Sequence, residues 1–470
     1  MLPEQAARPS TEGFSSLARV VTIAIGVAVG YALIPADPQP AGAMRYPALA
    51  LTSALLFVPT IEAMTYGIKS ALKIRNTTLI GIVYWLLADL LQALFRIQAT
   101  TEGIKTAFLA TGLFAMAVSI GSSIRIFELP ASIRRFARIE LSDQTILLGA
   151  GISFVLGVFY YAYMANFSVS LIFTGLFERS RFEAPWARGS LGDANSFVEH
   201  LSYFGYLLPL FTAAMFARSS RYFNLKTILC AGMSTIFILF LAQGGGRTSI
   251  GAVLGSAILV GILLSRRKLM GFHIVTVFAV TFSVQVAMNY ILINRNVGLS
   301  TFELDKVTFS TINVDDNFNR LSQTADLVPS FYPYSGLQFF YFAIVRPIPR
   351  VLWPEKPVDP GFDLADLLGE RDTSFTISII GEAYAGFGFP LVFVIGLLFG
   401  VLARWWEQTL AECTTSVSVM LYSIGAMALF GAERGFVNIV LLSYPILALW
   451  AAFVLLRFGR SFVILGRGTA

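Results

Sequence analysis

Long apolar runs separated by short polar segments make up most of this chain. Twelve of these runs approach the roughly 20 residues that an α-helix needs to cross a bilayer. The short alternating segments of a transmembrane β-barrel are not the pattern here. The sequence therefore predicts an all-α polytopic membrane protein, a single membrane domain over residues 1–470, with about twelve spans at 17–35, 47–66, 77–97, 106–124, 144–164, 196–217, 226–242, 249–264, 272–293, 388–405, 415–431 and 436–456.

Two of the polar segments are long, about 165–195 and 294–387. Neither has the length or the repeated strand signals of an independent folded domain. The second contains an apolar run, 336–345, that is too short to cross a bilayer and ends next to Pro347. We expect this run to form a short interfacial or re-entrant helix.

The composition supports a membrane protein and excludes several other classes. Charged residues are 13% of the chain, against about 25% in soluble domains. Two cysteines and two histidines give no disulfide framework and no histidine-based metal site. There is no phosphate-binding loop motif for an internal ATPase. The net charge of +6 is explained by loop topology rather than by nucleic acid.

The cations alternate between the two sides of the predicted helices. The positive-inside rule places both termini and the cation-rich loops in the cytoplasm. The short loops on the other side hold few cations, and both long segments fall on that side, which we predict to be periplasmic. The cytoplasmic set is Arg8, Arg19, Lys69, Lys73, Arg75, Arg125, Arg134, Arg135, Arg138, Arg218, Arg221, Lys226, Arg266, Arg267, Lys268, Arg404, Arg457, Arg460 and Arg467; the outer short loops hold Arg45, Arg96, Lys105, Arg247 and Arg434.

One arginine, Arg247, lies between two apolar runs directly after three glycines, residues 244–246. Placing a charged side chain within the bilayer is costly in free energy unless it has a partner or faces a water-filled cavity. Glycines remove side chains and let a ligand approach the backbone. We expect Arg247 to bind an anion at the outer face; the alternative is a snorkelling anchor.

Two further outer regions present cations. The segment 346–357 holds Arg346, Arg350 and Lys356 among four prolines, which stiffen the backbone. Arginine reads phosphate oxygens through its planar fork, so an anion site is one interpretation and a solvated charged loop is the other. The third region is Arg434, which either joins this site or pairs locally with its neighbour Glu433.

Acids and bases for catalysis are few on this face. Glu382 precedes the tenth span among apolar residues, where desolvation would raise its pKa toward that of a general base; a capping or arginine-pairing role is the alternative. His200 titrates near neutrality but is also a common kind of interfacial anchor. Asp89 is predicted mid-span, where it would be a functional group or a structural partner.

These residues resemble those of a known family, the Wzy-type O-antigen and exopolysaccharide repeat-unit polymerases, which are related to the O-antigen ligases. The resemblance covers roughly residues 225–435 by motif and the rest by hydropathy. It rests on the Gly-Gly-Gly-Arg-Thr-Ser turn at 244–249, the proline-rich segment 348–357, the segment 381–388 that contains Glu382 and Tyr384, and the number of predicted spans. The ligases often have a histidine in the large periplasmic loop, and this chain has none there.

The resemblance implies a metal-independent glycosyltransferase of the bacterial inner membrane, with no cofactor. Its substrate would be an oligosaccharide on undecaprenyl pyrophosphate, polymerised at the periplasmic face, with a chain-length regulator as a further partner. The catalytic residues would be Arg247, Arg350 and Glu382, with the arginines neutralising the leaving pyrophosphate and Glu382 taking the acceptor proton. The substrate-binding residues would be Arg247, Arg346, Arg350, Lys356, Arg434, Tyr384 and His200.

Two alternatives stay open at this point. An O-antigen ligase would transfer the glycan to a different acceptor, which the sequence does not identify. A lipid-linked oligosaccharide flippase or other transporter would favour charge near the bilayer midplane and pseudo-symmetric halves. Asp89 is the central acid found, whereas the cations gather on one face, so the polymerase is the preferred interpretation.

Overall fold

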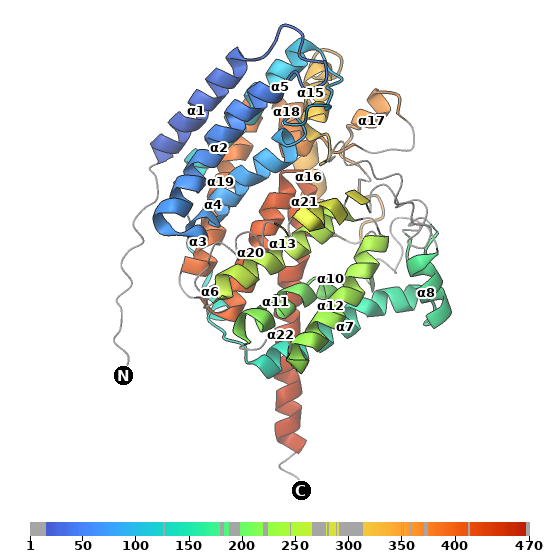
Figure 1. Cartoon of the computed structure of the whole chain (residues 1–470). Helices are drawn as coiled ribbons and strands as arrows, with labels where there is room; N and C mark the ends of the chain where they lie inside the picture. Colours follow the sequence, from blue (N-terminus) through green and yellow to red (C-terminus); the bar gives the residue numbers. More distant parts are fainter. Residues whose placement is uncertain are drawn as a thin grey trace.

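The computed structural model is helical in every element it describes (Figure 1). It describes residues 16–125, 127–178, 183–187, 198–219, 224–244, 246–265, 279, 282–287, 289–290, 314–348, 350, 352–357, 359–370, 375–411 and 414–466. Within these residues there is no strand. The predicted all-α class is confirmed for this part of the chain.

Within the described residues, seven helical segments are long and apolar enough to cross a membrane, which indicates a membrane-embedded protein. Three apolar segments are shorter: α1 (Ser16–Ala32), the pair α4 (Ile74–Ile82) and η1 (Val83–Leu87), and α20 (Ser416–Ala432). The seven long segments are α2 (Arg45–Tyr66), α5 (Thr101–Gly121), α7 (Asp143–Met164), α12 (Leu225–Gln243), α13 (Arg247–Leu264), α19 (Phe389–Ala411) and Val437–Leu456, which contains α21 (Val437–Leu441) and the start of α22 (Tyr444–Gly466).

Not every predicted span is one continuous helix. The predicted span 196–217 is divided into α10 (Ser202–Gly205) and α11 (Leu208–Arg218). Pro209 stands at the start of α11 and has no backbone N–H to continue the preceding turn. The predicted span 272–293 lies largely outside the described residues. The total of twelve spans therefore stays a prediction.

The loops gather at two opposite ends of the helical body. At what we call the first end, Ser416 N donates to Glu140 Oε2 at 2.8 Å, and Gln408 Nε2 donates to the Phe127 carbonyl at 2.8 Å. The described parts of the loops predicted to be cytoplasmic meet at this end, together with α3 (Ile68–Ala71) and α6 (Ala131–Ala137). Which side of a membrane it faces stays a prediction.

At the second end, the loops predicted to be periplasmic meet one another. Gln98 N donates to Asn319 Oδ1 at 2.7 Å, and Ile379 N donates to the Glu433 carbonyl at 3.1 Å. The long segment 294–387 contributes short helices here, and α16 forms where the apolar run 336–345 predicted one. These helices are α15 (Asn317–Leu327), α16 (Gln338–Val345), α17 (Leu364–Leu367) and α18 (Ser378–Phe387); α8 (Val169–Phe177) lies in the other long segment.

Close packing of α5 against α19 depends on glycine. A Cβ placed on Gly121 would lie 2.0 Å from the Leu397 carbonyl oxygen, and one on Gly400 would lie 2.2 Å from the Val118 carbonyl oxygen. Small residues at such crossings let two apolar helices approach backbone to backbone in a membrane. This crossing fixes the position of α19, which runs from the second end to the first.

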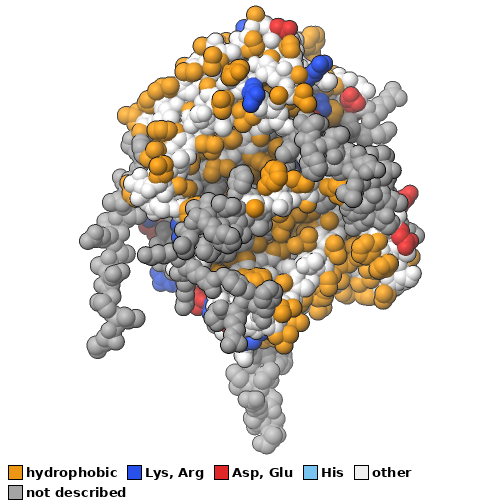
Figure 2. Space-filling model, in the orientation of Figure 1, with side chains coloured by type: hydrophobic (Ala, Val, Ile, Leu, Met, Phe, Trp, Pro, Cys, Tyr) orange, Lys and Arg blue, Asp and Glu red, His pale blue; other side chains and the backbone are white. Residues whose placement is uncertain are grey.

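The outer surface of the body is largely apolar. Figure 2 shows hydrophobic side chains spread over the exposed helical face, with the charged side chains in view lying mostly around its margins. Exposed members include Ile25, Leu49, Val155, Ile228 and Leu447. Such a surface fits contact with lipid, in agreement with the apolar helices.

Candidate anion site and its cavity

Arg247 is the first residue of α13, directly after the glycine-containing turn from α12. Its Nη2 lies 3.3 Å from Asp315 Oδ1, and its side chain is 20% exposed. A Cβ placed on Gly244 or Gly246 would meet no atom closer than 3.6 Å, so space beside the turn remains open. The expectation that this arginine needs an anionic partner is met inside the protein by Asp315.

Arg434 holds the same carboxylate from a second helix. It follows the C-terminus of α20, and both its Nε and its Nη2 donate to Asp315, the second at 3.3 Å from Oδ1. Asp315 is 10% exposed. The partner of Arg434 in this structure is therefore Asp315 rather than the neighbouring Glu433. Two arginines that are far apart in the sequence share one carboxylate.

Asp89 explains why Asp315 is held in this place. Its carboxylate accepts hydrogen bonds from three successive backbone N–H groups, those of Val314 at 3.0 Å, Asp315 at 3.3 Å and Asp316 at 3.1 Å. The preceding helix ends at Leu87, so Asp89 lies in a turn and not in the middle of a span as predicted. Its role here is to fix the turn that carries Asp315.

A cavity of about 380 Å³ opens beside the two arginines. From Arg247 to Ile262, α13 rises about 22 Å and presents one face to this cavity. Among the described residues of the lining, all are apolar apart from Arg247, Asp315, Arg434 and a few uncharged polar groups. It comprises Leu72, Thr77, Ile80, Tyr84, Trp85, Arg247, Thr248, Gly251, Ala252, Leu254, Gly255, Ile258, Leu259, Ile262, Val284, Gln285, Val314, Asp315, Met427, Phe430, Gly431 and Arg434.

A short π-helix, η1, places two aromatic residues on the wall of this cavity. Trp85 Nε1 donates to the Phe430 carbonyl at 2.7 Å, which ties η1 to α20. Tyr84 Oη donates to Gln285 Oε1 at 2.5 Å. Single π-turns often occur at functional sites because they shift side chains out of the regular helical register. Here the turn directs Tyr84 to the polar part of the lining.

Glu382 supports the turn that carries Arg434. Its Oε2 accepts a hydrogen bond from the Phe436 backbone N–H at 2.7 Å. Burial raises the pKa of Glu382 to about 8, and the hydrogen bond from Phe436 acts in the opposite direction. The predicted upward direction of this pKa agrees with the structure. The contact that Glu382 makes, however, is with the backbone two residues beyond Arg434.

Tyr384, on the same helix as Glu382, is buried and packs edge-on against Phe389 with ring centroids 5.5 Å apart. It is not among the residues that line the cavity. The structure therefore places Tyr384 in the packing between α18 and α19. A role in substrate binding stays a prediction.

The proline-rich segment folds back on itself through its cations. Arg350 Nη1 and Nη2 donate to the carbonyls of Pro354 and Pro357, each at 3.2 Å. Lys356 Nζ donates to the carbonyls of Ile348 at 2.7 Å and Arg346 at 3.0 Å. Within the described residues, neither Arg350 nor Lys356 contacts the arginines of the cavity. Both act on their own loop in this structure.

Arg346 and His200 lie beside aromatic rings. The Arg346 guanidinium is 5.6 Å from the centroid of the Phe342 ring. His200 lies 5.1 Å from the ring of Tyr444 and 6.0 Å from that of Tyr203. The structure thus places these two predicted site residues in an aromatic neighbourhood near the start of α22, and neither lines the cavity beside Arg247.

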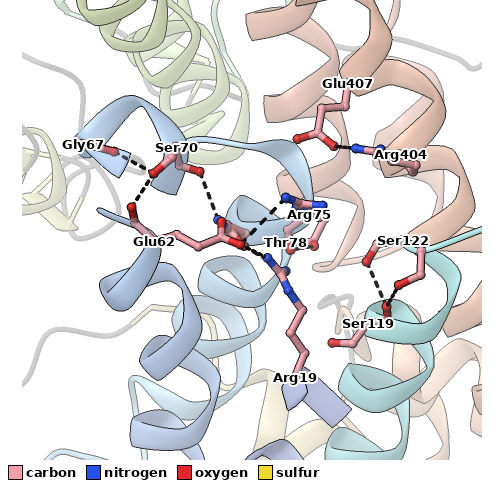
Figure 3. A network of polar contacts seen from close by, with 12 residues as sticks. Arg19, Glu62, Gly67, Ser70, Arg75, Thr78, Ser119, Ser122, Arg404 and Glu407 are labelled. Carbon is pink, nitrogen blue, oxygen red and sulfur yellow. Dashed lines mark hydrogen bonds and ion pairs between the residues drawn. The ribbon is translucent and has the colours of Figure 1, made fainter. Parts of the chain in front are cut away.

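A second buried ionic cluster lies at the first end (Figure 3). Arg19 Nη2 donates to Glu62 Oε1 at 2.5 Å, and Arg19 Nη1 donates to Asn76 Oδ1 at 3.0 Å. Asn76 Nδ2 in turn donates to Glu62 Oε2 at 2.7 Å. Arg19 was expected among the loop cations, but it lies inside α1 and joins α1 to α2 and α4. This cluster was not predicted.

Among the site residues, the sequence missed Asp315 and Tyr84. Asp315 stands in the pair Asp315-Asp316 within a long polar segment, where acidic residues are ordinary. Comparison of the chain with protein-family models, curated proteins and solved structures finds no match. The family resemblance therefore stays a prediction from motifs, and the site is defined by its geometry.

Proposed function

We propose that this chain is a membrane-embedded glycosyltransferase that polymerises oligosaccharide repeat units carried on a polyprenyl pyrophosphate. The observation that carries this proposal is the cavity, which combines an arginine pair at one end with apolar walls along most of α13. A lipid with an anionic headgroup has the same two parts. The headgroup would lie at Arg247 and Arg434, and the hydrocarbon tail would follow α13.

The arginine pair suits a pyrophosphate. Arg434 already directs two donors on one edge of its guanidinium, Nε and Nη2, to a carboxylate. This side-on arrangement is also the one in which arginine binds phosphate oxygens. Among the described charged residues that line the cavity, two are cations and one is an anion. A headgroup with several negative charges would restore the balance.

The apolar part suits a hydrocarbon chain. Along α13 the lining positions recur every three or four residues, as on one face of a helix. Gly251 and Gly255 lie on this face, while Leu254, Ile258 and Ile262 provide apolar contact. Burying the tail here would remove its apolar surface from water near the headgroup level.

The proposed reaction is a glycosyl transfer. The hydroxyl oxygen of the acceptor sugar forms a bond to the anomeric carbon of the donor glycan, and the bond from that carbon to the pyrophosphate oxygen breaks. Negative charge develops on the departing pyrophosphate, where Arg247 and Arg434 would stabilise it. Removal of one such preorganised donor typically lowers the rate about 10²–10³-fold.

We assign Glu382 a positioning role in this proposal. A base must be ionised to accept the acceptor proton, whereas a pKa of about 8 keeps most of Glu382 protonated at neutral pH. Its carboxyl group holds the Phe436 backbone beside Arg434 and does not line the cavity. In this proposal the proton of the acceptor hydroxyl leaves on an oxygen of the released pyrophosphate.

The test uses the purified full chain in detergent with lipid-linked repeat units as substrate. The proposal predicts longer glycans in the wild type and a loss of at least about 100-fold in rate for Arg247→Ala and for Arg434→Ala. Arg45→Ala is the matched control, because Arg45 is an exposed arginine at the second end that does not line the cavity.

The alternatives give different results in the same assay. A ligase would attach the glycan to a different acceptor and would not lengthen the lipid-linked repeats. A flippase would move the lipid across a proteoliposome membrane and leave the glycan length unchanged. Longer glycans at wild-type rate in both arginine variants would contradict the proposed site.

A further inference from the structure

We propose that Asp315 is a resident counter-anion that occupies the headgroup position, and that a lipid pyrophosphate binds by displacing its carboxylate from Arg434 and Arg247. This inference rests on the proposed function, because it concerns how the same cavity takes its ligand. It assigns Asp315 as a residue that sets which anions can enter.

Asp315 occupies the edge of the Arg434 guanidinium that a phosphate would use. Both Nε and Nη2 of that guanidinium donate to the Asp315 carboxylate. The same edge is the one that would hold two phosphate oxygens side by side. A carboxylate and a phosphate cannot both accept these two hydrogen bonds, so ligand and Asp315 compete.

The backbone at Asp315 is fixed independently of the arginines. The Asp89 carboxylate binds the backbone N–H groups of residues 314–316. Asp316 then adopts a left-handed backbone conformation with a φ of 55° directly before α15. The side chain of Asp315 can therefore turn away from the arginines while the turn that carries it stays in place.

The position from which the Asp315 carboxylate would be displaced borders the cavity. Arg247, Asp315 and Arg434 all line it, so the carboxylate stands between the arginines and the space that a ligand would fill. An uncharged lipid forms no ionic contact with the two arginines. It therefore gains no binding free energy that would offset their lost contacts with Asp315. An anion with several charges does, because it can take up the donors of both guanidinium groups.

The expected change in affinity for the diphosphate depends on the fraction of molecules in which the two arginines are not bound to Asp315. The apparent dissociation constant equals the intrinsic constant divided by that fraction. If Asp315 occupies the arginines in about 90–99% of molecules, removing its charge tightens binding about 10–100-fold. A residue with a purely structural role would weaken binding when changed, so the direction of the change separates the two roles.

The experiment measures the dissociation constant of a short polyprenyl diphosphate, and of the matching polyprenol, on the full chain in detergent. For Asp315→Asn the proposal predicts diphosphate binding at least about tenfold tighter than in the wild type. Asp315→Glu should return toward the wild-type value because it restores a carboxylate. Asp316→Asn is the matched control, with the same charge change one residue further along the turn.

Three results would overturn this inference. If the wild type prefers the diphosphate but Asp315→Asn binds it equally or more weakly, the counter-anion role is wrong and the proposed function stands. If neither protein prefers the diphosphate to the polyprenol, both are wrong. If Asp315→Asn and Asp315→Ser both lose the monodisperse helical state, the carboxylate is needed for folding and is not displaceable.

Discussion

The two ends of this molecule each set two arginines against one carboxylate, and their surroundings differ. At the first end, Arg19 is 2% exposed and Glu62 is fully buried, with Arg75 at 3.8 Å and Asn76 bonded to both Arg19 and Glu62. At the second end, Arg247 and Arg434 are 20% and 27% exposed and border a cavity of about 380 Å³.

This difference in surroundings distinguishes an ionic cluster that joins helices from one that forms part of a binding site. In the first-end cluster, an amide completes the hydrogen bonding of the carboxylate, and three helices are joined. In the second-end pair, the carboxylate comes from a turn that a separate acid, Asp89, holds in position. The charges at the second end are next to open space, so a ligand can change their partners without unfolding the protein.

Removing the carboxylate of the first-end cluster should have the largest effect on stability. Glu62→Ala leaves the buried Arg19 without its anion, and such a loss typically costs about 3–5 kcal/mol. We expect this decrease in the free energy of unfolding, measured by denaturant titration in detergent. The double variant Arg19→Leu/Glu62→Leu should recover much of it, since it removes both charges.

The matched control for that variant is Glu102→Ala, which removes an exposed carboxylate from an i,i+3 pair with Lys105. Exposed pairs of this kind contribute about 0–1 kcal/mol. If Glu62→Ala were no more damaging than Glu102→Ala, the first-end cluster would not be architectural, and the contrast between the two ends would be lost.

A smaller effect concerns the support of Arg434 and depends on pH. Below about pH 4.5 the Glu382 carboxyl is protonated in both the folded and the unfolded chain, so it adds no pH dependence. Between that value and about 8, the unfolded chain ionises while the folded protein keeps the proton. Stability should therefore fall as the pH rises through this window and level off above it, by an amount on the order of a few kcal/mol.

Glu382→Gln should remove this contribution, because the glutamine carbonyl can still accept from the Phe436 N–H and does not ionise. The measurement is the thermal unfolding midpoint of both proteins from pH 5 to pH 9. The difference between them isolates Glu382 from other titrating groups. A difference that does not change with pH would show that the carboxyl is not held in its protonated form.

The helices and the grouping of loops were accessible from the sequence because both depend on local patterns. Apolar run length predicted the long helices, and glycines beside Arg247 marked the turn before α13. The sequence did not predict that the helix ends at Leu87. Asp89 reads as a mid-span acid, but its role depends on the backbone of residues 314–316, which lies more than 220 residues further along the chain.

The partners within the site were not predictable for the same reason. Arg434 and Asp315 are separated by 119 residues, and nothing near either one indicates the other. Arg350 and Lys356 show the reverse case. Their proline-rich surroundings suggested an anion site, yet both side chains bond to backbone carbonyls of the same segment, Arg350 to that of Pro354 and Lys356 to that of Ile348.

In the proposed function, the cavity holds the tail of a lipid whose anionic headgroup lies at Arg247 and Arg434. Photo-crosslinking tests it most directly, using a polyprenyl diphosphate with a photoreactive group near the end of a tail long enough to follow α13. We predict labelling of α13 around Leu254–Ile262 that competes with unlabelled diphosphate and disappears in Arg434→Ala. Labelling confined to other helices, or unchanged in Arg434→Ala, would contradict the claim.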